Sequence, residues 1–273
     1  MQARTTWSPP GGALGRLTLA ARKRAESLLA SDGELRVKAE EATPGPGLAS
    51  SIADRDTVAV IGEIKRRSPS RGVMDPSMDA AARARDLVSV GAAAISVLTE
   101  PVEFGGSNDD LIQVLGAVSC PVLKKDFHVH PLQIWEARAL GASAALLIAR
   151  ALGREETRFL AESAREAGIE ALIEVRDEKE LDWALEARAV LIGVNRRNLE
   201  TLEMESDVLE RLLPRIPSGC IAIAESGISS RADVEAVALL GADAVLVGSL
   251  LSTARDARSE AAALQGVRRA ARR

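Results

Sequence analysis

The sequence predicts an α/β protein, a (β/α)8 TIM barrel with an N-terminal helical extension. The chain has 273 residues, enough for one large domain. A helical segment, a glycine turn and a short apolar strand recur along it, as in ALGASAALLIA at Gly141 and LLGADAVLVGS at Gly241. The expected strands start at intervals of roughly 20 to 35 residues, which is typical of βα units with parallel strands.

Eight apolar segments fit the strand pattern, and four of them follow a glycine turn, at Gly91, Gly141, Gly168 and Gly241. A glycine just past a helix caps it in the left-handed conformation and leads the chain into the next strand. The expected strands are Val58–Ile64, Ala92–Thr99, Val122–Phe127, Ala144–Ala149, Glu170–Val175, Val190–Asn195, Cys220–Ser226 and Ala244–Ser249. Eight such units favour a closed barrel over a doubly wound open sheet, because the fingerprint GxGxxG is missing after the first strand.

Helical patterns lie between these strands and before the first one. The expected helices are Ala80–Val90, Asp109–Val118, Pro131–Leu140, Glu156–Ala167, Glu178–Glu186, Asp207–Leu213 and Arg231–Leu240. An amphipathic helix over Leu17–Leu29 and a loop EATPGPG precede the barrel. We therefore expect residues 1–57 to form a helical extension packed on a barrel of residues 58–273, within a single domain.

Composition excludes several classes of protein. Hydrophobic residues make up 47% of the chain, so a sizeable core is expected. A net charge of −4 argues against nucleic-acid binding, and no apolar run is long enough to span a bilayer. The N-terminus lacks the apolar core of a signal peptide, so a cytoplasmic protein is expected. Cys120 and Cys220 are expected to be buried thiols, and the basic tail GVRRAARR receives no role.

Ionisable residues gather at the carboxyl ends of the expected strands, where barrels of this type carry their chemistry. In VAVIGEIKRRSPSRG, Glu63 and Lys65 are two residues apart and so share one face of a buried strand. Later strands end in Lys125, Glu174, Asn195 and Glu225. The alternative interpretation is a layer of salt bridges that fills the barrel, but aliphatic residues normally fill these layers. The pattern therefore favours a site for acid–base chemistry.

Glycines and serines after the last two strands suit an anion site. Ser226 and Gly227 follow strand seven, and Gly248 and Ser249 end strand eight. Backbone N–H groups at glycines approach an anion closely, and this end of the barrel is the usual phosphate position. The alternative is that the two glycines only form turns.

The expected mouth of the barrel is basic in an acidic protein. This focus of positive charge suits a small substrate with more than one negative group, and the residues concerned are Lys65, Arg66, Arg67, Arg71, Lys124, Lys125, Arg196 and Arg197. Phe104 and Phe127 also fall there and could contact a flat apolar ring, although core packing is the alternative. His128 and His130 form HxH, but without a third ligand at a convincing spacing they are expected to be loop residues, and no metal is predicted.

Seven segments together carry a family resemblance: GEIKRRSPSRG, ISVLTEPVEFGGS, VLKKDF, LIEV, IGVNRRNLETLE, IAESGI and VLVGSLL. In this order they resemble indole-3-glycerol phosphate synthase of tryptophan biosynthesis, from about Val58 to Leu251. The resemblance implies closure of the pyrrole ring of a carboxyphenylamino-deoxyribulose phosphate, with loss of carbon dioxide and water. It implies no metal or organic cofactor.

The resemblance also implies roles for single residues. Lys125 would be the general acid at the ketone oxygen, Glu174 its partner acid/base, and Lys65 would hold the substrate carboxylate. Glu63 would flank the reacting centre, and Asn195 and Glu225 would orient groups near the amine and the ribulose hydroxyls. The phosphate would bind at Ser68, Ser226, Gly227, Gly248 and Ser249, and the aromatic ring would lie among Phe104, Phe127 and Leu199, with Arg197 close by. The division of acid roles between Lys125 and Lys65 stays open.

Two other functions remain as alternatives at this stage. The first is a phosphosugar isomerase of the tryptophan or histidine pathways, although such enzymes typically use an Asp or Cys acid–base pair. The second is a non-catalytic barrel that binds a phosphorylated ligand. A small phosphorylated substrate is the expected partner, with no nucleic acid or membrane, and the protein is expected to be a monomer or weak homodimer.

Overall fold

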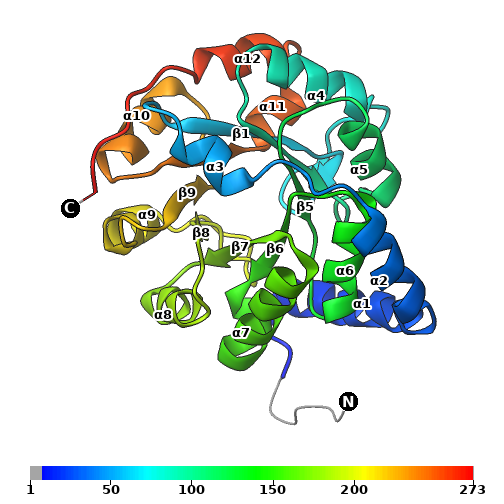
Figure 1. Ribbon diagram of the computed structural model, residues 1–273. Coiled ribbons are helices and arrows are strands. Elements are labelled where there is room, and N and C mark those ends of the chain that lie inside the picture. The colour runs from blue at the N-terminus through cyan, green and yellow to red at the C-terminus, as the bar shows by residue number, and fades with distance from the viewer. Residues whose placement is uncertain (1–7, 273) are drawn as a thin grey trace.

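Eight parallel strands close into a barrel in the computed structural model, which describes residues 8–272 (Figure 1). The strands follow one another around the barrel in the order β1-β10-β9-β8-β7-β6-β5-β4, and β4 pairs with β1 again. The predicted (β/α)8 barrel is therefore confirmed. The strands are β1 (Ala59–Ile64), β4 (Ala94–Leu98), β5 (Val122–Lys125), β6 (Ala144–Ile148), β7 (Glu170–Val175), β8 (Leu191–Asn195), β9 (Ile221–Glu225) and β10 (Ala244–Val247).

Helices surround the barrel close to where the sequence predicts them. They are α4 (Ala80–Ser89), α5 (Asn108–Leu115), α6 (Pro131–Leu140), α7 (Ala149–Ala167), α8 (Glu178–Glu186), α9 (Val208–Leu212) with η2 (Leu213–Arg215), and α10 (Arg231–Leu239). Gly141 and Gly168 end α6 and α7 with φ values of 96° and 71°, which confirms the left-handed caps. The helix predicted from Glu156 starts at Ala149 instead. Gly153, at φ 74°, kinks α7 and interrupts the helical pattern.

Two segments near the site do not appear in the sequence prediction. An antiparallel pair, β2 (Arg67–Ser68) and β3 (Gly72–Val73), lies between β1 and α4. After β10, the chain forms α11 (Ser249–Thr253) and α12 (Ala257–Ala263). The eighth strand therefore ends at Val247 and not at Ser249, because Gly248 is the residue that caps α11. Two-residue strands carry no periodicity, so the sequence pattern contains no signal for them.

The segment before β1 contains four helical pieces where the sequence predicts one. They are α1 (Gly12–Leu28), η1 (Leu29–Ser31), α2 (Asp32–Glu41) and α3 (Leu48–Ala53). Helices α1 and α2 pack on α6, and α3 crosses the end of the barrel at which the strands start (Figure 1). Leu14, Leu48 and Ile52 are fully buried in these contacts. The division of the chain at residues 57 and 58 stays a prediction, and residues 1–7 lie outside the described part.

The basic C-terminal tail is bound to the start of the barrel. Val58 N donates to Val267 O at 2.8 Å, and Arg269 N donates to Asp56 O at 3.1 Å. The buried carboxylate of Asp243, just before β10, accepts hydrogen bonds from Arg269 and, at 2.5 Å, from Arg272. The tail thus ties the start of β10 to the segment that leads into β1, a structural role that the sequence pattern does not indicate.

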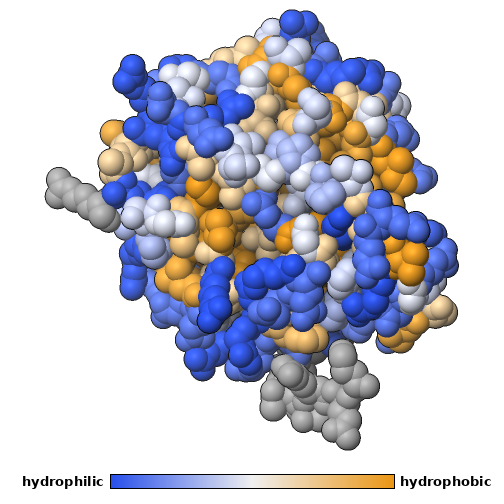
Figure 2. Space-filling view, viewed as in Figure 1, coloured by the Kyte–Doolittle hydropathy of each residue, from blue (hydrophilic) through white to orange (hydrophobic). Residues whose placement is uncertain are grey.

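Hydrophilic residues make up most of the face seen in Figure 2, with hydrophobic residues between them. Among the helices of residues 8–272, none is both long and apolar enough to cross a membrane.

We expect Asp243→Ala to lower the free energy of unfolding by about 3–5 kcal/mol. The change leaves Arg272, whose side chain is only 6% exposed, without its carboxylate. Equilibrium denaturation with urea measures the difference. The control is Glu34→Ala, which removes an exposed pair with Lys38 and is expected to change the free energy of unfolding far less. Equal effects of the two substitutions would contradict a structural role of the tail.

Candidate active site

Ionisable side chains from four strands meet inside the carboxyl end of the barrel. Lys125 of β5 lies at the centre, and its Nζ atom is 3.8 Å from Glu63 Oε2 of β1. The same atom is 4.0 Å from Glu174 Oε2 of β7 and 3.9 Å from Glu225 Oε2 of β9. Lys65 Nζ donates a hydrogen bond of 2.6 Å to Glu63 Oε1, as the two-residue spacing predicts. Two lysines and three glutamates therefore form one cluster.

Alternation along each strand decides which charges join this cluster. Lys125 points into the barrel, whereas its neighbour Lys124 pairs with Glu136 of the outer helix α6. Arg66 is likewise directed outward and binds Asp110 of α5 at 2.7 Å. Of the eight basic residues predicted at the mouth, Lys65, Arg71, Lys125 and Arg197 line the cavity described below. The prediction of a basic mouth was wrong for Arg66, Arg67, Lys124 and Arg196, which do not line that cavity.

The cluster fixes the protonation of its lysine. Burial alone would lower the pKa of Lys125, but the carboxylates of Glu63, Glu225 and Glu174 outweigh it and raise the pKa above its ordinary value. Burial raises the pKa of Glu63, yet Lys65 and Lys125 reverse this effect and hold it below its ordinary value. Lys125 is thus a charged ammonium and Glu63 a carboxylate at neutral pH.

Glu225 carries the opposite shift. Burial, followed by repulsion from Glu174, raises its pKa well above the ordinary value, although Lys125 opposes the change. A proton on Glu225 relieves this repulsion. Gly193 of β8 leaves room for the Glu225 carboxylate, because a Cβ atom at position 193 would lie 2.0 Å from Glu225 Oε1.

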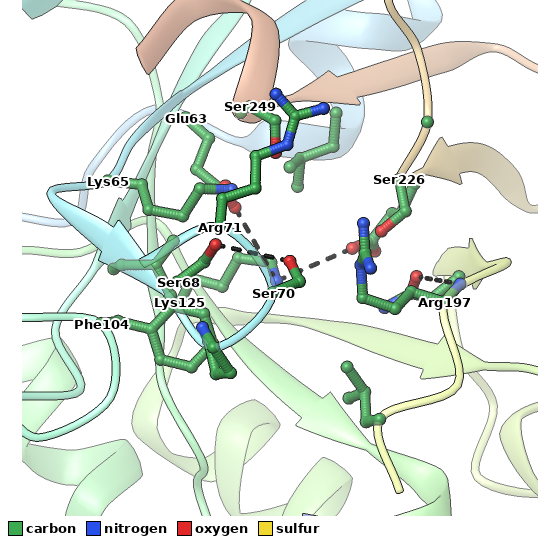
Figure 3. Close-up of a pocket in the computed structure, with 18 of the residues that line it drawn as sticks. Glu63, Lys65, Ser68, Ser70, Arg71, Phe104, Lys125, Arg197, Ser226 and Ser249 are labelled. Atoms are coloured by element: carbon green, nitrogen blue, oxygen red, sulfur yellow. Dashed lines mark hydrogen bonds and ion pairs between the residues drawn. The ribbon is translucent and has the colours of Figure 1, made fainter. Parts of the chain in front are cut away.

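A cavity of about 220 Å³ opens above the cluster (Figure 3). We call it the mouth cavity. Fourteen of the fifteen predicted site residues line it: Glu63, Lys65, Ser68, Phe104, Lys125, Phe127, Asn195, Arg197, Leu199, Glu225, Ser226, Gly227, Gly248 and Ser249. The exception is Glu174, which contacts Lys125 from the side and lines a smaller cavity behind it. The structure therefore brings the predicted residues together around Lys125.

One side of the mouth cavity presents backbone, hydroxyl and guanidinium groups. Ser226 and Gly227 after β9 have φ values of 65° and 78°, so two successive residues adopt the left-handed conformation. The left-handed conformation is sterically unfavourable for a serine, and such strained backbone is typical of functional sites. Gly248 lies against Glu63, since a Cβ atom at this position would be 2.0 Å from Glu63 Oε1. Backbone at these positions can approach a bound group closely.

Two guanidinium groups face this side without a carboxylate between them. Arg71 comes from the β2–β3 hairpin and Arg197 from the loop after β8, and Figure 3 shows both directed into the cavity. Burial, and then the charge of Arg71, lower the pKa of Arg197. Ser68 and Ser70 of the same hairpin add hydroxyl groups. This concentration of donors and positive charge suits an anion.

The other side of the mouth cavity is apolar. The rings of Phe104 and Phe127 lie with centroids 6.3 Å apart and are tilted by 39°. Leu199 follows β8, and Leu17 reaches the cavity from α1 of the N-terminal segment. A flat apolar group fits between such side chains.

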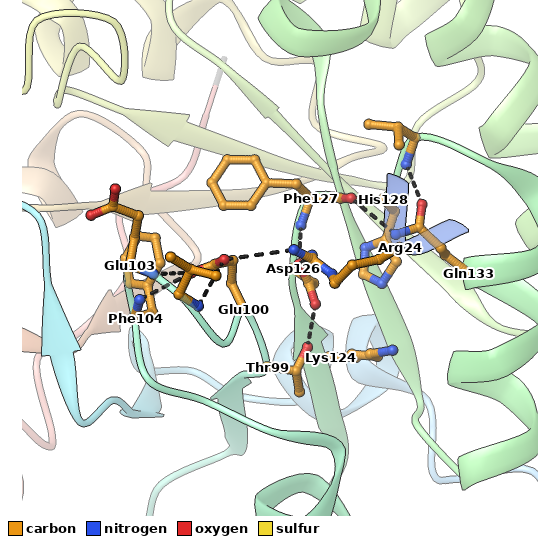
Figure 4. Close-up of polar contacts among 12 residues, drawn as sticks. Arg24, Thr99, Glu100, Glu103, Phe104, Lys124, Asp126, Phe127, His128 and Gln133 are labelled. Atoms are coloured by element: carbon orange, nitrogen blue, oxygen red, sulfur yellow. Dashed lines mark hydrogen bonds and ion pairs between the residues drawn. The ribbon is translucent and has the colours of Figure 1, made fainter. Parts of the chain in front are cut away.

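Arg24 of α1 holds this apolar wall in place (Figure 4). Its guanidinium binds Asp126 at 2.5 Å and lies 3.6 Å from Glu100. Glu100 accepts the backbone N–H of Phe104 at 3.0 Å, and Asp126 accepts that of Phe127 at 2.7 Å. One arginine thus connects the two loops that carry the aromatic rings. Neither Arg24 nor Leu17 has a signal in the sequence, because both stand in an ordinary amphipathic helix.

The two histidines of HxH make hydrogen bonds to the backbone within the fold. His130 caps α6, where its Nδ1 accepts from Leu132 N at 3.2 Å. His128 is buried with Nδ1 2.8 Å from Leu146 O. Burial, and then the charge of Lys124, lower the pKa of His128 to about 4, so the ring is neutral.

The fold and this cluster define a (β/α)8-barrel protein whose ionisable groups gather at the face where enzymes of this fold have their active sites. Comparison with known proteins then identifies the family. The model of the family described as indole-3-glycerol phosphate synthase matches residues 15–264. The chain belongs to this family, as the seven sequence segments predicted.

Individual relatives agree with this assignment. The chain is 48% identical over 249 residues to the indole-3-glycerol phosphate synthase of Mycolicibacterium gilvum, covering 91% of this chain and 90% of the relative. It is 47% identical over 223 residues to indole-3-glycerol phosphate synthase 1 of Streptomyces coelicolor, with 82% of each chain covered. A solved structure of thiamine phosphate pyrophosphorylase from Pyrococcus furiosus matches with a TM-score of 0.57 and 15% identity, over 80% of this chain and 96% of that one. That likeness concerns the fold alone.

We expect Glu225→Gln to change how stability depends on pH. A carboxyl group whose pKa is raised in the folded state contributes stability at low pH, and loses it as pH rises from the ordinary value of 4.5 towards the raised value. The neutral amide of Gln cannot ionise, so the variant does not lose this stability as pH rises. Thermal midpoints at pH 5 and pH 8 should therefore differ less in Glu225→Gln than in the unsubstituted protein.

The exposed Glu210→Gln of α9 serves as a control and should keep the original difference between the two midpoints. If Glu225→Gln also kept the original difference between the two midpoints, Glu225 would not hold the proton that we assign to it.

Proposed function

We propose that this protein is an indole-3-glycerol phosphate synthase, which closes the indole ring of 1-(2-carboxyphenylamino)-1-deoxyribulose 5-phosphate with loss of carbon dioxide and water. The observation that carries the proposal is the charged Lys125 at the floor of a cavity with an anion-binding side and an apolar side. Membership of the family and the names of its relatives support the same activity.

Lys125 supplies the proton for ring closure in this proposal. The ketone oxygen becomes strongly basic only as the new carbon–carbon bond forms, so the donor has to be protonated beforehand and close to the oxygen. The three carboxylates keep Lys125 in this form. Lys65, paired with Glu63, binds the substrate carboxylate before it leaves as carbon dioxide. The sharing of acid roles between the two lysines stays open.

The later steps need a base and a second donor, because the ring hydroxyl leaves as water and a proton leaves carbon. Glu174 acts as this acid/base, with the proton of Glu225 beside it. Asn195 and Glu225 orient the amine and the hydroxyl groups of the substrate. Asn195 also shapes its own loop, since its Oδ1 accepts the N–H of Arg197 at 2.9 Å.

The two sides of the mouth cavity hold the two ends of the substrate. The phosphate binds at the side formed by Ser68, Ser226, Gly227, Gly248 and Ser249, with Arg71 and Arg197 as counter-charges. The aromatic ring lies between Phe104 and Phe127 with Leu199 beneath. This arrangement places the ketone carbon between both ends, near Lys125.

The proposal also covers cofactors, cellular location and oligomeric state. The chemistry above uses only side chains of this chain, so we propose that no metal or organic cofactor takes part. A cytoplasmic location and a monomer or weak homodimer remain predictions from the sequence. The isomerase alternative is not favoured, because the family match names the synthase and the cluster pairs two lysines with three glutamates.

We expect Lys125→Ala to lower kcat by about 10²–10⁴-fold, because a positioned general acid contributes on that order. Product formation is followed by indole fluorescence with the carboxyphenylamino-deoxyribulose phosphate as substrate. Binding of inorganic phosphate, measured by calorimetry, should stay unchanged. The neighbouring Lys124→Met is the matched control, since Lys124 points out of the barrel towards Glu136.

The assay also separates the alternatives. An isomerised sugar phosphate without indole fluorescence would support the isomerase, and bound phosphate without any turnover would support the non-catalytic barrel. Activity of Lys125→Ala within tenfold of the original would remove Lys125 from the acid role.

We expect Gly193→Ala to reduce kcat at least tenfold, because the added methyl group displaces the Glu225 carboxylate from Lys125. Gly33→Ala in α2 is the control, as no atom lies within 4 Å of the added methyl group. Steady-state kinetics of both variants test this, and equal kcat values would show that the cluster tolerates displacement.

A further inference from the structure

A second and much smaller cavity lies beside Glu174 and shares Arg197 and Leu199 with the mouth cavity. Its volume of about 10 Å³ matches the space that a single water molecule needs. We call it the rear cavity. It is lined by Leu14, Ile148, Arg150, Glu174, Val175, Arg176, Glu180, Arg197, Asn198, Leu199 and Glu200. Several of these side chains are polar, so the cavity meets the requirement of hydrogen-bonding partners for a water molecule.

Arg197 and Leu199 line both cavities, whereas Glu174 connects the rear cavity to the charged cluster. It contacts Lys125 on the mouth side, and it lines only the rear cavity of the two. Its Oε2 atom is buried and makes no hydrogen bond with any other residue in the range 8–272. This oxygen is the one that faces Lys125, at 4.0 Å, so a water molecule in the rear cavity would hydrogen-bond the carboxylate from its other side.

Glu180 faces the rear cavity from the first turn of α8. It is only 2% exposed, and its Oε1 atom lies 2.6 Å from Arg150 Nε of α7. Its Oε2 atom accepts the N–H of Arg176 at 2.8 Å. Burial raises the pKa of Glu180 to about 7; Arg150 opposes the shift and Asp177 adds to it. This carboxyl group can therefore both give and take a proton at neutral pH.

A purely structural interpretation accounts for only part of this arrangement. Glu180 N donates to Asp177 Oδ1 at 2.9 Å, and the return bond from Arg176 N completes a local cap at the start of α8. Capping explains why an acidic residue stands here. It does not explain why the residue is buried beside a water-sized polar cavity that it shares with Glu174.

The reaction itself creates a need for protons, if the proposed function is correct. The substrate carboxylate leaves as neutral carbon dioxide and the ketone oxygen leaves as water. The product therefore carries one negative charge fewer than the substrate, and each turnover takes up one proton from solvent. The substrate fills the mouth cavity during these steps, so a proton that enters from the mouth has to pass it.

We propose that Glu180, through one water molecule in the rear cavity, exchanges protons between solvent and Glu174 while substrate occupies the mouth cavity. Glu180 gives its proton to the water, the water gives one to Glu174, and solvent returns one to Glu180. The way out passes Arg150, whose side chain is 36% exposed. Arg176, Arg197 and Glu200 are the other charged groups that line the rear cavity. Glu180 does not contact the substrate and acts through Glu174.

Two substitutions at the same position separate proton exchange from capping. Glu180→Gln keeps an acceptor for Arg176 N but cannot titrate, whereas Glu180→Asp titrates but reaches less far. In the unsubstituted protein we expect kcat to fall as pH rises through about 7, where Glu180 loses its proton. Glu180→Gln should lower kcat about tenfold below pH 7 and abolish this fall.

Glu180→Asp should keep the fall of kcat with pH, and thermal midpoints check that both variants fold. Glu186→Gln, at the exposed end of the same helix, is the control and should keep the profile of the unsubstituted protein. Equal losses in Glu180→Gln and Glu180→Asp with the pH profile retained would overturn the proposal, as would an unsubstituted protein whose kcat does not change near pH 7. If the unsubstituted protein made no indole product, the proposed function itself would fail instead.

Discussion

The site depends on one constraint, which is that the ammonium of Lys125 sits among three carboxylates in a barrel interior that excludes most water. Charges of both signs are stable there only together, because each alone would lose its hydration without compensation. Two lysines face three glutamates, and a proton on Glu225 brings the cluster to charge balance. A binding ligand that carries its own charges upsets this balance, and proton transfer is the way in which the cluster restores it.

The rest of the molecule brings the members of this cluster together from separate strands. The parallel register pairs Lys125 with Leu98 of β4 and Asn195 with Glu225, so the carboxyl ends of these strands meet at one end of the barrel. Glycines at 193 and 248 leave room where carboxylates cross to neighbouring strands. The N-terminal segment contributes as well, because Arg24 connects the loops of Phe104 and Phe127. The tail at Asp243 ties the opposite end of the barrel, far from the chemistry.

The fold and most of the site could be predicted because they depend on local patterns. Strand ends are visible in the sequence, and alternation places Glu63 and Lys65 on one face. Alternation also shows why Lys124 should have been excluded from the mouth, since it adjoins Lys125. The contributions of Arg24, Leu17 and the C-terminal tail could not be predicted. They arise from tertiary contacts between separate segments, such as that of Arg24 with Asp126, and no periodicity records them.

The two cavities give the cluster two different environments. The mouth cavity of about 220 Å³ is large enough for a substrate, whereas the rear cavity of about 10 Å³ admits only water. Glu174 lines the rear cavity and contacts Lys125 of the mouth cavity, so it can exchange protons with both. A decarboxylating ring closure has need of both, because water must stay away from the reacting carbons while a proton enters in each cycle. A carboxyl group that contacts Lys125 but lines only the rear cavity lets protons enter by another route than the substrate. This position explains why Glu174 does not line the mouth cavity, unlike every other predicted site residue.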